Sequence, residues 1–334
     1  MDGMNRTRLG NTGPTVSRIG LGAMGMSGAY GESSDDESIR TIHAALDAGV
    51  DLVDTGDFYG AGHNEMLIGR ALKERNRDDV VLSVKFGALR GPDGGWLGFD
   101  GRPESVKSSL GYTLQRLGVD HVDVYRPARL DPRVPIEDTV GAIAEMIEAG
   151  YVRHIGLSEI GSETLRRAAA VHPISDLQIE YSIVSRGIEA DILDTARGLG
   201  VGITAYGVLS RGLLSNTFRA HKPLSADDFR AHSPRFQGEN LTRNVELVEL
   251  LAEIADDRSI TVAQLAIAWV MSRGDDIVPV IGARSVERLM ETIAAEDISL
   301  SPDEVARIES AVPTDAVAGT RYAESQMAQL DSEV

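Results

Sequence analysis

Hydrophobic and polar positions follow two alternating patterns along the chain. Short apolar runs, such as residues 52–53 and 80–84, are separated by longer segments in which apolar residues recur every three or four positions, as at Ile39, Ile42 and Leu46. The first pattern is typical of buried strands and the second of amphipathic helices that pack one face on a core. The alternation therefore predicts an α/β protein.

Eight predicted strands each precede a predicted helix. The strands end at Gly22, Asp54, Lys85, Tyr125, Leu157, Glu180, Tyr206 and Ile281. The helices cover residues 35–48, 64–73, 103–117, 135–149, 162–171, 188–199, 240–257, 261–272 and 285–294. Strands that alternate with such helices form a parallel sheet, and eight units in about 300 residues match a closed barrel. We therefore predict a (β/α)8 TIM barrel.

Further segments flank the predicted barrel. Residues 6–22 begin with a β-hairpin, and residues 302–312 form a last helix before a polar tail that we expect to be mobile. No linker rich in proline, serine or charge divides the chain, so we expect one domain over residues 1–334. Three long loops follow strand ends and should wall the mouth of the barrel, at residues 86–101, 126–134 and 207–239.

Composition limits the possible partners of this 334-residue chain. The net charge of −18 argues against nucleic acid and anionic membranes as partners. No apolar run approaches the ~18 residues of a membrane span, and the start lacks the order of a signal peptide. The absence of cysteine excludes disulfides and a cysteine nucleophile, and the scattered histidines argue against a metal enzyme. We expect a cytoplasmic protein, and the oligomeric state stays open.

Three side chains with complementary chemistry occur where two successive strands stop. Asp54 ends one strand, Tyr59 follows five residues later, and Lys85 ends the next strand. In a barrel of parallel strands these ends meet at one mouth, where chemistry is done. Taken singly, each residue has an alternative role, as a loop cap, a packing side chain or a solvated strand end. Together they predict a catalytic centre.

Two glycine motifs suggest other classes of enzyme but lack the required context. Residues 20–25 match the Gly-x-Gly-x-x-Gly dinucleotide pattern, yet a loop follows where that pattern requires a helix. Residues 156–161 nearly form a nucleophile elbow, with the last glycine one position late. A Rossmann fold and a serine hydrolase are therefore disfavoured.

The segment Asp54-Thr55-Gly56-Asp57-Phe58-Tyr59-Gly60, with Asn64-Glu65 after it, resembles the aldo-keto reductase superfamily. The resemblance continues nearly end to end, through residues 9–13, 20–22, 123–125, 131–132, 153–158, 178–182, 205–209 and 279–282. It implies a (β/α)8 barrel and reversible carbonyl reduction that depends on NADPH.

The three candidate catalytic residues have consistent roles in such a reduction. Carbonyl reduction needs a hydride, which only a cofactor supplies, and a proton. Tyr59 is the expected general acid, although the free pKa of tyrosine is about 10. Lys85, one of four lysines, is expected to lower that pKa, and Asp54 to hold Lys85 charged and aimed.

One departure from the family pattern falls at Ala128, where the resemblance implies a histidine that contacts the substrate oxygen. Arg126 or Arg129 could reach the vacated space, or the protein could bind nucleotide with little turnover. We favour a third explanation, in which Tyr59 and Lys85 suffice and Ala128 makes room for a bulkier substrate. Fungal pyridoxal reductases share the missing histidine, so the resemblance adds pyridoxal-like aromatic aldehydes as candidate substrates.

The resemblance also assigns a cofactor cradle. Ser158 and Gln178 would contact the nicotinamide carboxamide, and Tyr206 would stack on its ring. Backbone N–H groups of the next loop would bind the pyrophosphate, at Gly207, Leu209, Ser210, Arg211 and Gly212. The next helix begins near Gly282, Arg284 and Arg288, so its free N–H groups favour an anion. The two arginines favour the 2′-phosphate of the adenosine, and therefore NADPH over NADH. Glu291 matches an adenine contact, whereas Thr292 replaces the usual asparagine.

We therefore expect a reductase that uses NADPH to convert an aldehyde or ketone to an alcohol. A nucleotide-binding regulatory subunit, like the potassium-channel β subunits, is the main alternative because it also keeps the three catalytic residues. A lyase with a Schiff base on Lys85 is a third possibility, which Asp54 would oppose. Four aromatic residues are candidates for the wall of the substrate pocket or for simple packing: Tyr30, Phe58, Trp96 and Phe99.

Overall fold

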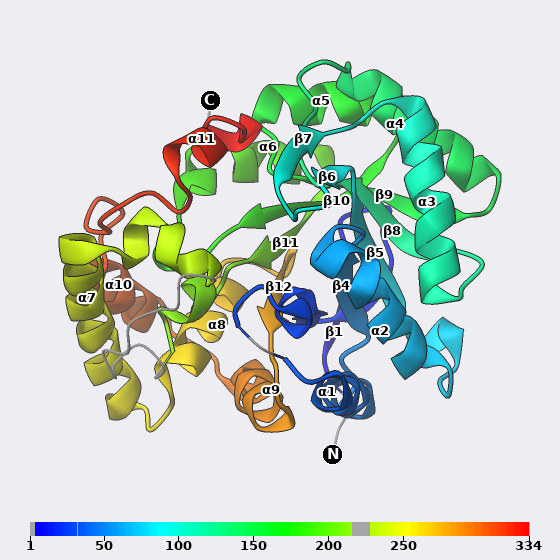
Figure 1. Cartoon of the computed structure of the whole chain (residues 1–334). Helices are drawn as coiled ribbons and strands as arrows, with labels where there is room; N and C mark the ends of the chain where they lie inside the picture. The colour runs from blue at the N-terminus through cyan, green and yellow to red at the C-terminus, as the bar shows by residue number, and fades with distance from the viewer. Residues whose placement is uncertain (1–3, 32, 216–227, 334) are drawn as a thin grey trace.

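Eight parallel strands close into a barrel at the centre of the protein (Figure 1), in a computed structural model that describes residues 4–31, 33–215 and 228–333. The barrel strands are β3 (Gly20–Gly22), β4 (Leu52–Gly56), β5 (Val81–Phe86), β8 (Val122–Pro127), β9 (Val152–Ser158), β10 (Ile174–Glu180), β11 (Gly202–Tyr206) and β12 (Ile277–Gly282). Their spatial order follows the chain around the barrel and closes between β12 and β3. The predicted (β/α)8 barrel is confirmed.

Helices surround the strands as a ring (Figure 1). They are α1 (Asp35–Asp47), α2 (His63–Leu72), α3 (Pro103–Leu117), α4 (Ile136–Glu148), α5 (Ser162–Val171), α6 (Ile192–Leu199), α7 (Gly238–Asp257), α8 (Val262–Ser272), α9 (Val286–Ile293), α10 (Pro302–Ala311) and α11 (Glu324–Met327). None of the helices among the described residues is long and apolar enough to cross a bilayer.

Local sequence signals explain where several helices begin. Ser301 caps α10 in a reciprocal capping box with Glu304, and Pro302 occupies the first helical position. Thr261 and Gln264 form the same motif at α8. The predicted helix over residues 188–199 is instead a helical turn at Gly187–Ala190 followed by α6, because the chain leaves helical geometry at Asp191.

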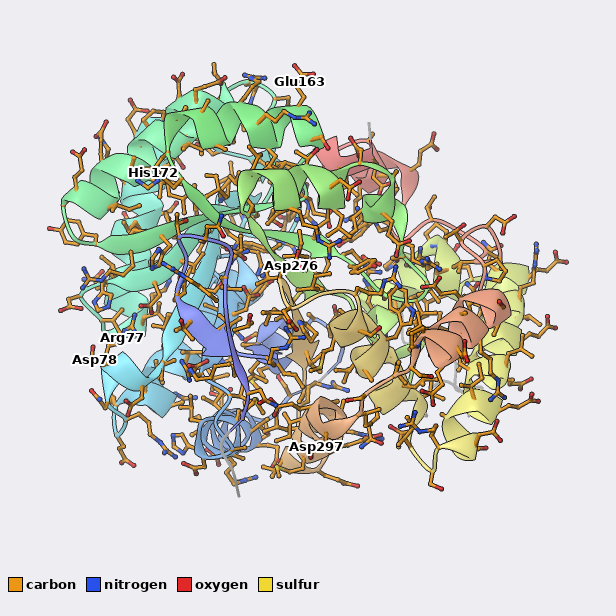
Figure 2. All side chains as sticks on the ribbon, turned by 180° about the vertical axis from the view of Figure 1, so that it is seen from behind. Arg77, Asp78, Glu163, His172, Asp276 and Asp297 are labelled. Carbon is orange, nitrogen blue, oxygen red and sulfur yellow. The ribbon has the colours of Figure 1, made fainter. Side chains whose placement is uncertain are left out.

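The hairpin of β1 (Arg6–Arg8) and β2 (Thr15–Ser17) was predicted from its turn sequence. It closes the amino-terminal end of the barrel. Leu9 is fully buried and packs with apolar residues from inside the barrel, including Leu52 and Val278. Figure 2 shows the molecule from the side opposite to that of Figure 1. Its labelled residues Arg77, His172 and Asp276 each precede a barrel strand and so mark this end of the barrel. The opposite end is therefore the open mouth.

Two segments around the mouth are more ordered than the sequence predicts. The loop over residues 86–101 contains an antiparallel hairpin, formed by β6 (Ala88–Arg90) and β7 (Trp96–Phe99). The polar tail, expected to be mobile, carries α11 and packs back on the barrel. Of the third predicted loop, residues 216–227 lie outside the described part of the chain.

Candidate active site

The register of the barrel strands brings the candidate catalytic residues to one end. Asp54 on β4 is the partner of Ser83 on β5, and Gly56 is the partner of Lys85. Across the barrel, Ser158 on β9 is the partner of Gln178 on β10. Because neighbouring parallel strands advance together, side chains near their carboxyl ends converge on one buried layer.

A hydrogen-bonded network joins Asp54, Lys85 and Gln178 inside this layer. The Nζ atom of Lys85 donates to Asp54 Oδ1 and to Gln178 Oε1, the latter at 2.7 Å. Gln178 Nε2 donates to Asp54 Oδ2 at 2.8 Å, and Ser83 Oγ donates to the same oxygen at 2.8 Å. The expected ion pair between Lys85 and Asp54 is present, and Gln178 closes the triangle.

Burial sets the protonation of this pair. Burial acts to raise the pKa of Asp54, but the charges of Lys85 and Arg126 outweigh it and hold that pKa below its usual value. Burial lowers the pKa of Lys85 to about 8, although Asp54 acts in the opposite direction. At neutral pH the pair is therefore an aspartate and an ammonium group, with the ammonium close to its titration point.

Tyr59 lies in a tight turn just beyond β4. Gly60 and Ala61 both have positive φ angles, 56° and 53°, which turn the chain sharply after the tyrosine. The Tyr59 side chain is buried, and the Lys85 ammonium lies 5.4 Å from the centre of its ring. The predicted lowering of its pKa is wrong in direction: burial first and the negative charge of Asp54 second raise the pKa of Tyr59 well above 10.

Arg126 does not fill the space beside Ala128. It lies within β8, fully buried, where its guanidinium donates to Asp176 Oδ2 at 2.9 Å and to Ser83 Oγ at 2.9 Å. The sequence predicted that this strand ends at Tyr125, so it placed Arg126 in the following loop, whereas the strand continues to Pro127 and the Arg126 side chain is buried inside the barrel. The hypothesis that Arg126 contacts a substrate oxygen is therefore wrong, because the side chain forms an ion pair inside the barrel.

A cavity of about 1070 Å³ opens above the network. Its lining includes Asp54, Tyr59, Lys85, Ala128 and Arg129 at one end. Most of the predicted cofactor residues also line it: Ser158, Gln178, Tyr206, Gly207, Leu209, Arg211, Gly212, Gly282, Arg284, Arg288 and Glu291. Ser210 is buried and does not line the cavity.

The four aromatic candidates for the pocket wall, Tyr30, Phe58, Trp96 and Phe99, all line the same cavity. Phe58 packs edge-on against Tyr59, with ring centres 4.7 Å apart, and more loosely against Trp96 at 6.5 Å. Trp96 packs on Phe99 at 5.1 Å. The β6–β7 hairpin thus brings an aromatic wall to Tyr59.

The other end of the cavity carries cationic and polar groups at the start of α9. Ser285 caps this helix, and Arg284 and Arg288 flank the cap. Arg288 donates to Glu291 at 2.9 Å. Glu37 of α1, which the sequence did not single out, also lines the cavity, and Val286 N donates to its carboxylate at 3.4 Å.

A second polar network at the rim was missed by the sequence analysis. Glu159 is fully buried, adopts a φ of 53°, and pairs with Arg321 of the tail at 2.5 Å. It also accepts from the Tyr206 hydroxyl at 2.7 Å. Tyr322 contacts Tyr206 through their hydroxyls at 2.9 Å, so the tail forms part of the cavity wall. No local sequence signal connects these distant residues.

The site and its scaffold define a class of protein: a parallel (β/α)8 barrel with a buried aspartate, lysine and tyrosine at its mouth, beside a cavity large enough for a nucleotide. The profile of the aldo/keto reductase family matches residues 18–313. The chain belongs to this family, whose members are carbonyl oxidoreductases that generally bind nicotinamide cofactors.

Individual relatives agree with this assignment. The chain is 41% identical over 318 residues to the probable aldo-keto reductase 1 of Glycine max, covering 94% of this chain and 91% of that protein. It is similar in structure to the glycerol dehydrogenase AKR11B4 from Gluconobacter oxydans, with a TM-score of 0.84, 28% identity and coverage of 93% and 96% of the two chains. The holo form of aldo-keto reductase AKR11C1 from Bacillus halodurans gives a TM-score of 0.76, 25% identity and coverage of 93% and 97%.

Proposed function

We propose that this protein is a reductase that uses NADPH to convert an aldehyde or ketone to an alcohol, with Tyr59 as the general acid. The observation that carries the proposal is the buried triangle of Asp54, Lys85 and Gln178 next to Tyr59 in a single cavity. The regulatory alternative keeps the same three residues, so measured turnover is what distinguishes the two functions.

The residues that line the cavity fit a nicotinamide dinucleotide. Ser158 Oγ is buried and has no hydrogen-bond partner among the described residues, although it lines the cavity. Such an atom is costly unless a ligand or water satisfies it, and an amide group would do so. Gln178 Nε2 keeps a second N–H for the same amide. Tyr206 would support the ring, and the Gly207–Gly212 turn the pyrophosphate.

The chain's own residues handle the proton. A reduced nicotinamide, when bound, supplies the hydride for the carbonyl carbon. Tyr59 is protonated at neutral pH and holds the proton to be donated, although burial raises its pKa and makes the hydroxyl a weaker acid. Donation leaves a buried phenolate, which the nearby Lys85 ammonium stabilises. Asp54 and Gln178 fix the position of that ammonium.

Glu37 bears directly on the choice between NADPH and NADH. The hydrogen bond from Arg40 first, and that from Val286 N second, lower the pKa of Glu37, so its carboxylate is charged at neutral pH. A carboxylate at the start of α9 disfavours a 2′-phosphate and suits a ribose hydroxyl, whereas Arg284 and Arg288 favour the phosphate. We give more weight to the two arginines, and expect Glu37→Gln to strengthen NADPH binding several-fold relative to NADH. Tighter binding of NADH than NADPH by the wild type would overturn the choice of NADPH.

The decisive experiment combines binding and turnover. Protein fluorescence would measure NADPH and NADH binding, and NADPH oxidation would be followed with a panel of aldehydes. Tyr59→Phe should lose turnover by about 10²–10⁴-fold while it still binds NADPH, because only the proton donor is removed. Tyr125→Phe is the matched control, since its hydroxyl contacts Val106 O and lies outside the cavity.

Other outcomes identify other functions. Tight nucleotide binding without turnover on any carbonyl would favour the regulatory alternative and point to Ala128 as the reason. The lowered pKa of Lys85, about 8, also suits a Schiff base. Covalent trapping of a carbonyl on Lys85 by borohydride would support that third function, and the absence of trapping would exclude it.

A further inference from the structure

The arginines that line the cavity differ in how their charges are balanced. They are Arg90, Arg129, Arg211, Arg230, Arg284 and Arg288. Three form ion pairs of 2.6–3.0 Å with carboxylates, in the pairs Arg211–Glu180, Arg230–Asp228 and Arg288–Glu291. Arg284 donates to the carbonyl oxygen of Tyr30, and Arg90 is exposed over the ring of Trp96. Arg129 is half-buried, whereas Arg90 and Arg284 are exposed.

Arg129 has no ion-pair partner among the described residues. One terminal nitrogen donates to the carbonyl oxygen of Ala128 at 2.5 Å, and the other lies 3.5 Å from the Tyr322 hydroxyl. A guanidinium has five N–H donors, so three remain without a partner in the described part of the chain. Burial acts to lower the pKa of Arg129, but Tyr206, Tyr322 and Glu159 outweigh it, so the guanidinium is charged and its remaining donors are available to an anion in the cavity.

The loop and the tail position this guanidinium. Burial first and Glu159 second raise the pKa of Tyr206 well above 10, so its hydroxyl stays protonated and donates to Glu159. Tyr206 then accepts from Tyr322, whose oxygen faces the Arg129 nitrogen. Arg211 lies 4.5 Å from the centre of the Tyr322 ring. Tyr322 is therefore a positioning residue for Arg129.

Arg129 lies on the side of the cavity that carries Tyr59 and Lys85. It directly follows Ala128, whose N–H donates to Phe86 O at 2.8 Å, so the loop starts beside the strand that carries Lys85. Burial raises the pKa of Tyr59, and the positive charge of Arg129 acts against that rise. The cation is thus close enough to affect the proton donor. Arg284 and Arg288, in contrast, flank the start of α9.

We propose that Arg129 forms an anion-binding subsite, so that the preferred carbonyl substrates carry a carboxylate. This inference rests on the proposed reductase function and names the class of its substrate. A single guanidinium can bind a carboxylate with two parallel hydrogen bonds. Arg211, the cavity arginine near Tyr322, is already paired with Glu180, so Arg129 acts as a single cation and suits a monoanion. Because the net charge of −18 repels anions in general, a local cation would decide which substrates enter.

A pair of matched aldehydes tests the proposal through turnover. The substrates are 4-carboxybenzaldehyde and its neutral methyl ester, with kcat/KM measured for wild type and Arg129→Gln. Wild type should prefer the acid, and Arg129→Gln should lose about 10- to 100-fold more on the acid than on the ester, because any effect of Arg129 on Tyr59 is common to both substrates. Arg133→Gln is the control, since Arg133 lies on the same loop, pairs with Asp131 and does not line the cavity.

A binding experiment keeps the proposal separate from the reductase function. Calorimetry would measure the binding of 4-(hydroxymethyl)benzoate and of the corresponding neutral amide to the protein. Arg129→Gln should weaken the benzoate about tenfold or more and leave the amide unchanged. If no carbonyl is reduced but benzoate binding depends on Arg129, the reductase function fails and the anion subsite stands. Equal effects of Arg129→Gln on acid and neutral compounds in both assays would overturn the subsite, even if aldehydes are reduced.

Discussion

Two polar networks lie at the mouth of this barrel, and they are assembled in different ways. The interior network consists of strand residues, among them Asp54, Lys85 and Arg126, and each is placed by the register of its strand. The rim network joins Glu159, just after β9, to Arg321 of the tail, 162 positions away. The first is a property of the barrel, whereas the second exists only because the tail returns to the mouth.

This difference separates the residues that would take part in the proposed reaction from the residues that shape the cavity around it. The interior network positions the proton donor and its ammonium, which the proposed reaction requires in the same place for every substrate. The rim network holds Tyr206 and, through Tyr322, the Arg129 guanidinium. We infer that changes in the interior network affect folding and the chemical step, and that changes at the rim affect the tail and the choice of substrate.

The largest effect is expected from breaking the interior network at Arg126. Arg126 and Asp176 are both fully buried, so Arg126→Met leaves an aspartate without a counter-ion inside the barrel. The free energy of unfolding should fall by about 3–5 kcal/mol, measured by urea denaturation. The double variant Arg126→Met with Asp176→Leu should recover much of the loss. Lys107→Met, which breaks an exposed pair with Glu145, should cost under about 1 kcal/mol. A similarly small loss for Arg126→Met would show that the interior network does not contribute more to folding than an exposed ion pair.

A smaller effect is expected at the rim from Arg321→Met. Glu159 would remain buried but keep hydrogen bonds from Tyr206, from Ser332 and from the backbone N–H of Glu180. We expect a loss of about 1.5–3 kcal/mol, the usual range for a hydrogen bond to a charged group. Limited proteolysis should then cut the tail, after α10, while the barrel stays folded.

The Glu159–Arg321 pair should also control how the free energy of unfolding changes at acidic pH. Burial acts to raise the pKa of Glu159, but Arg321 outweighs it and the pKa falls from 4.5 to about 2. A depressed carboxyl pKa gives stability that is fully present above about pH 4.5 and is lost as the pH falls toward 2. Arg321→Met should therefore reduce the slope of unfolding free energy between these values. An unchanged slope would show that Arg321 does not control this titration.

The sequence predicted the interior residues better than the rim, for physical reasons. Asp54 and Lys85 end apolar runs, and a parallel barrel brings strand ends together, so their meeting follows from periodicity alone. Arg126 was misplaced because its partner, Asp176, is 50 positions away, and a charge inside a barrel is unfavourable without it. Arg321 lies in a polar tail whose composition resembles that of a mobile terminus. Only the folded structure shows which buried carboxylate it meets.

A pH profile should sharpen the role of the interior network at the level of chemistry. With the pKa of Lys85 at about 8, kcat should fall as the pH rises above that value, because the ammonium that stabilises the phenolate is lost. Asp54 acts to raise this pKa, so Asp54→Asn should move the alkaline limb to lower pH by about one unit. Asp123→Asn, at the opposite end of β8, should leave the limb in place. If the limb does not move in Asp54→Asn, Lys85 is not the group that titrates.

The smallest effect is expected at the exposed edge of the rim, where one guanidinium serves two carboxylates. Arg321 contacts Glu159 at 2.5 Å and Glu333 at 2.7 Å, but Glu159 is fully buried whereas the Glu333 side chain is 39% exposed. Water can replace Arg321 as a partner of Glu333 and cannot reach Glu159, so distance alone does not set the energy of either pair. Glu333→Gln should change the free energy of unfolding by less than about 1 kcal/mol, against about 1.5–3 kcal/mol for Arg321→Met. Equal losses in the two variants, measured in the same urea titration, would mean that the end of the tail, and not the buried carboxylate, fixes Arg321 at the mouth.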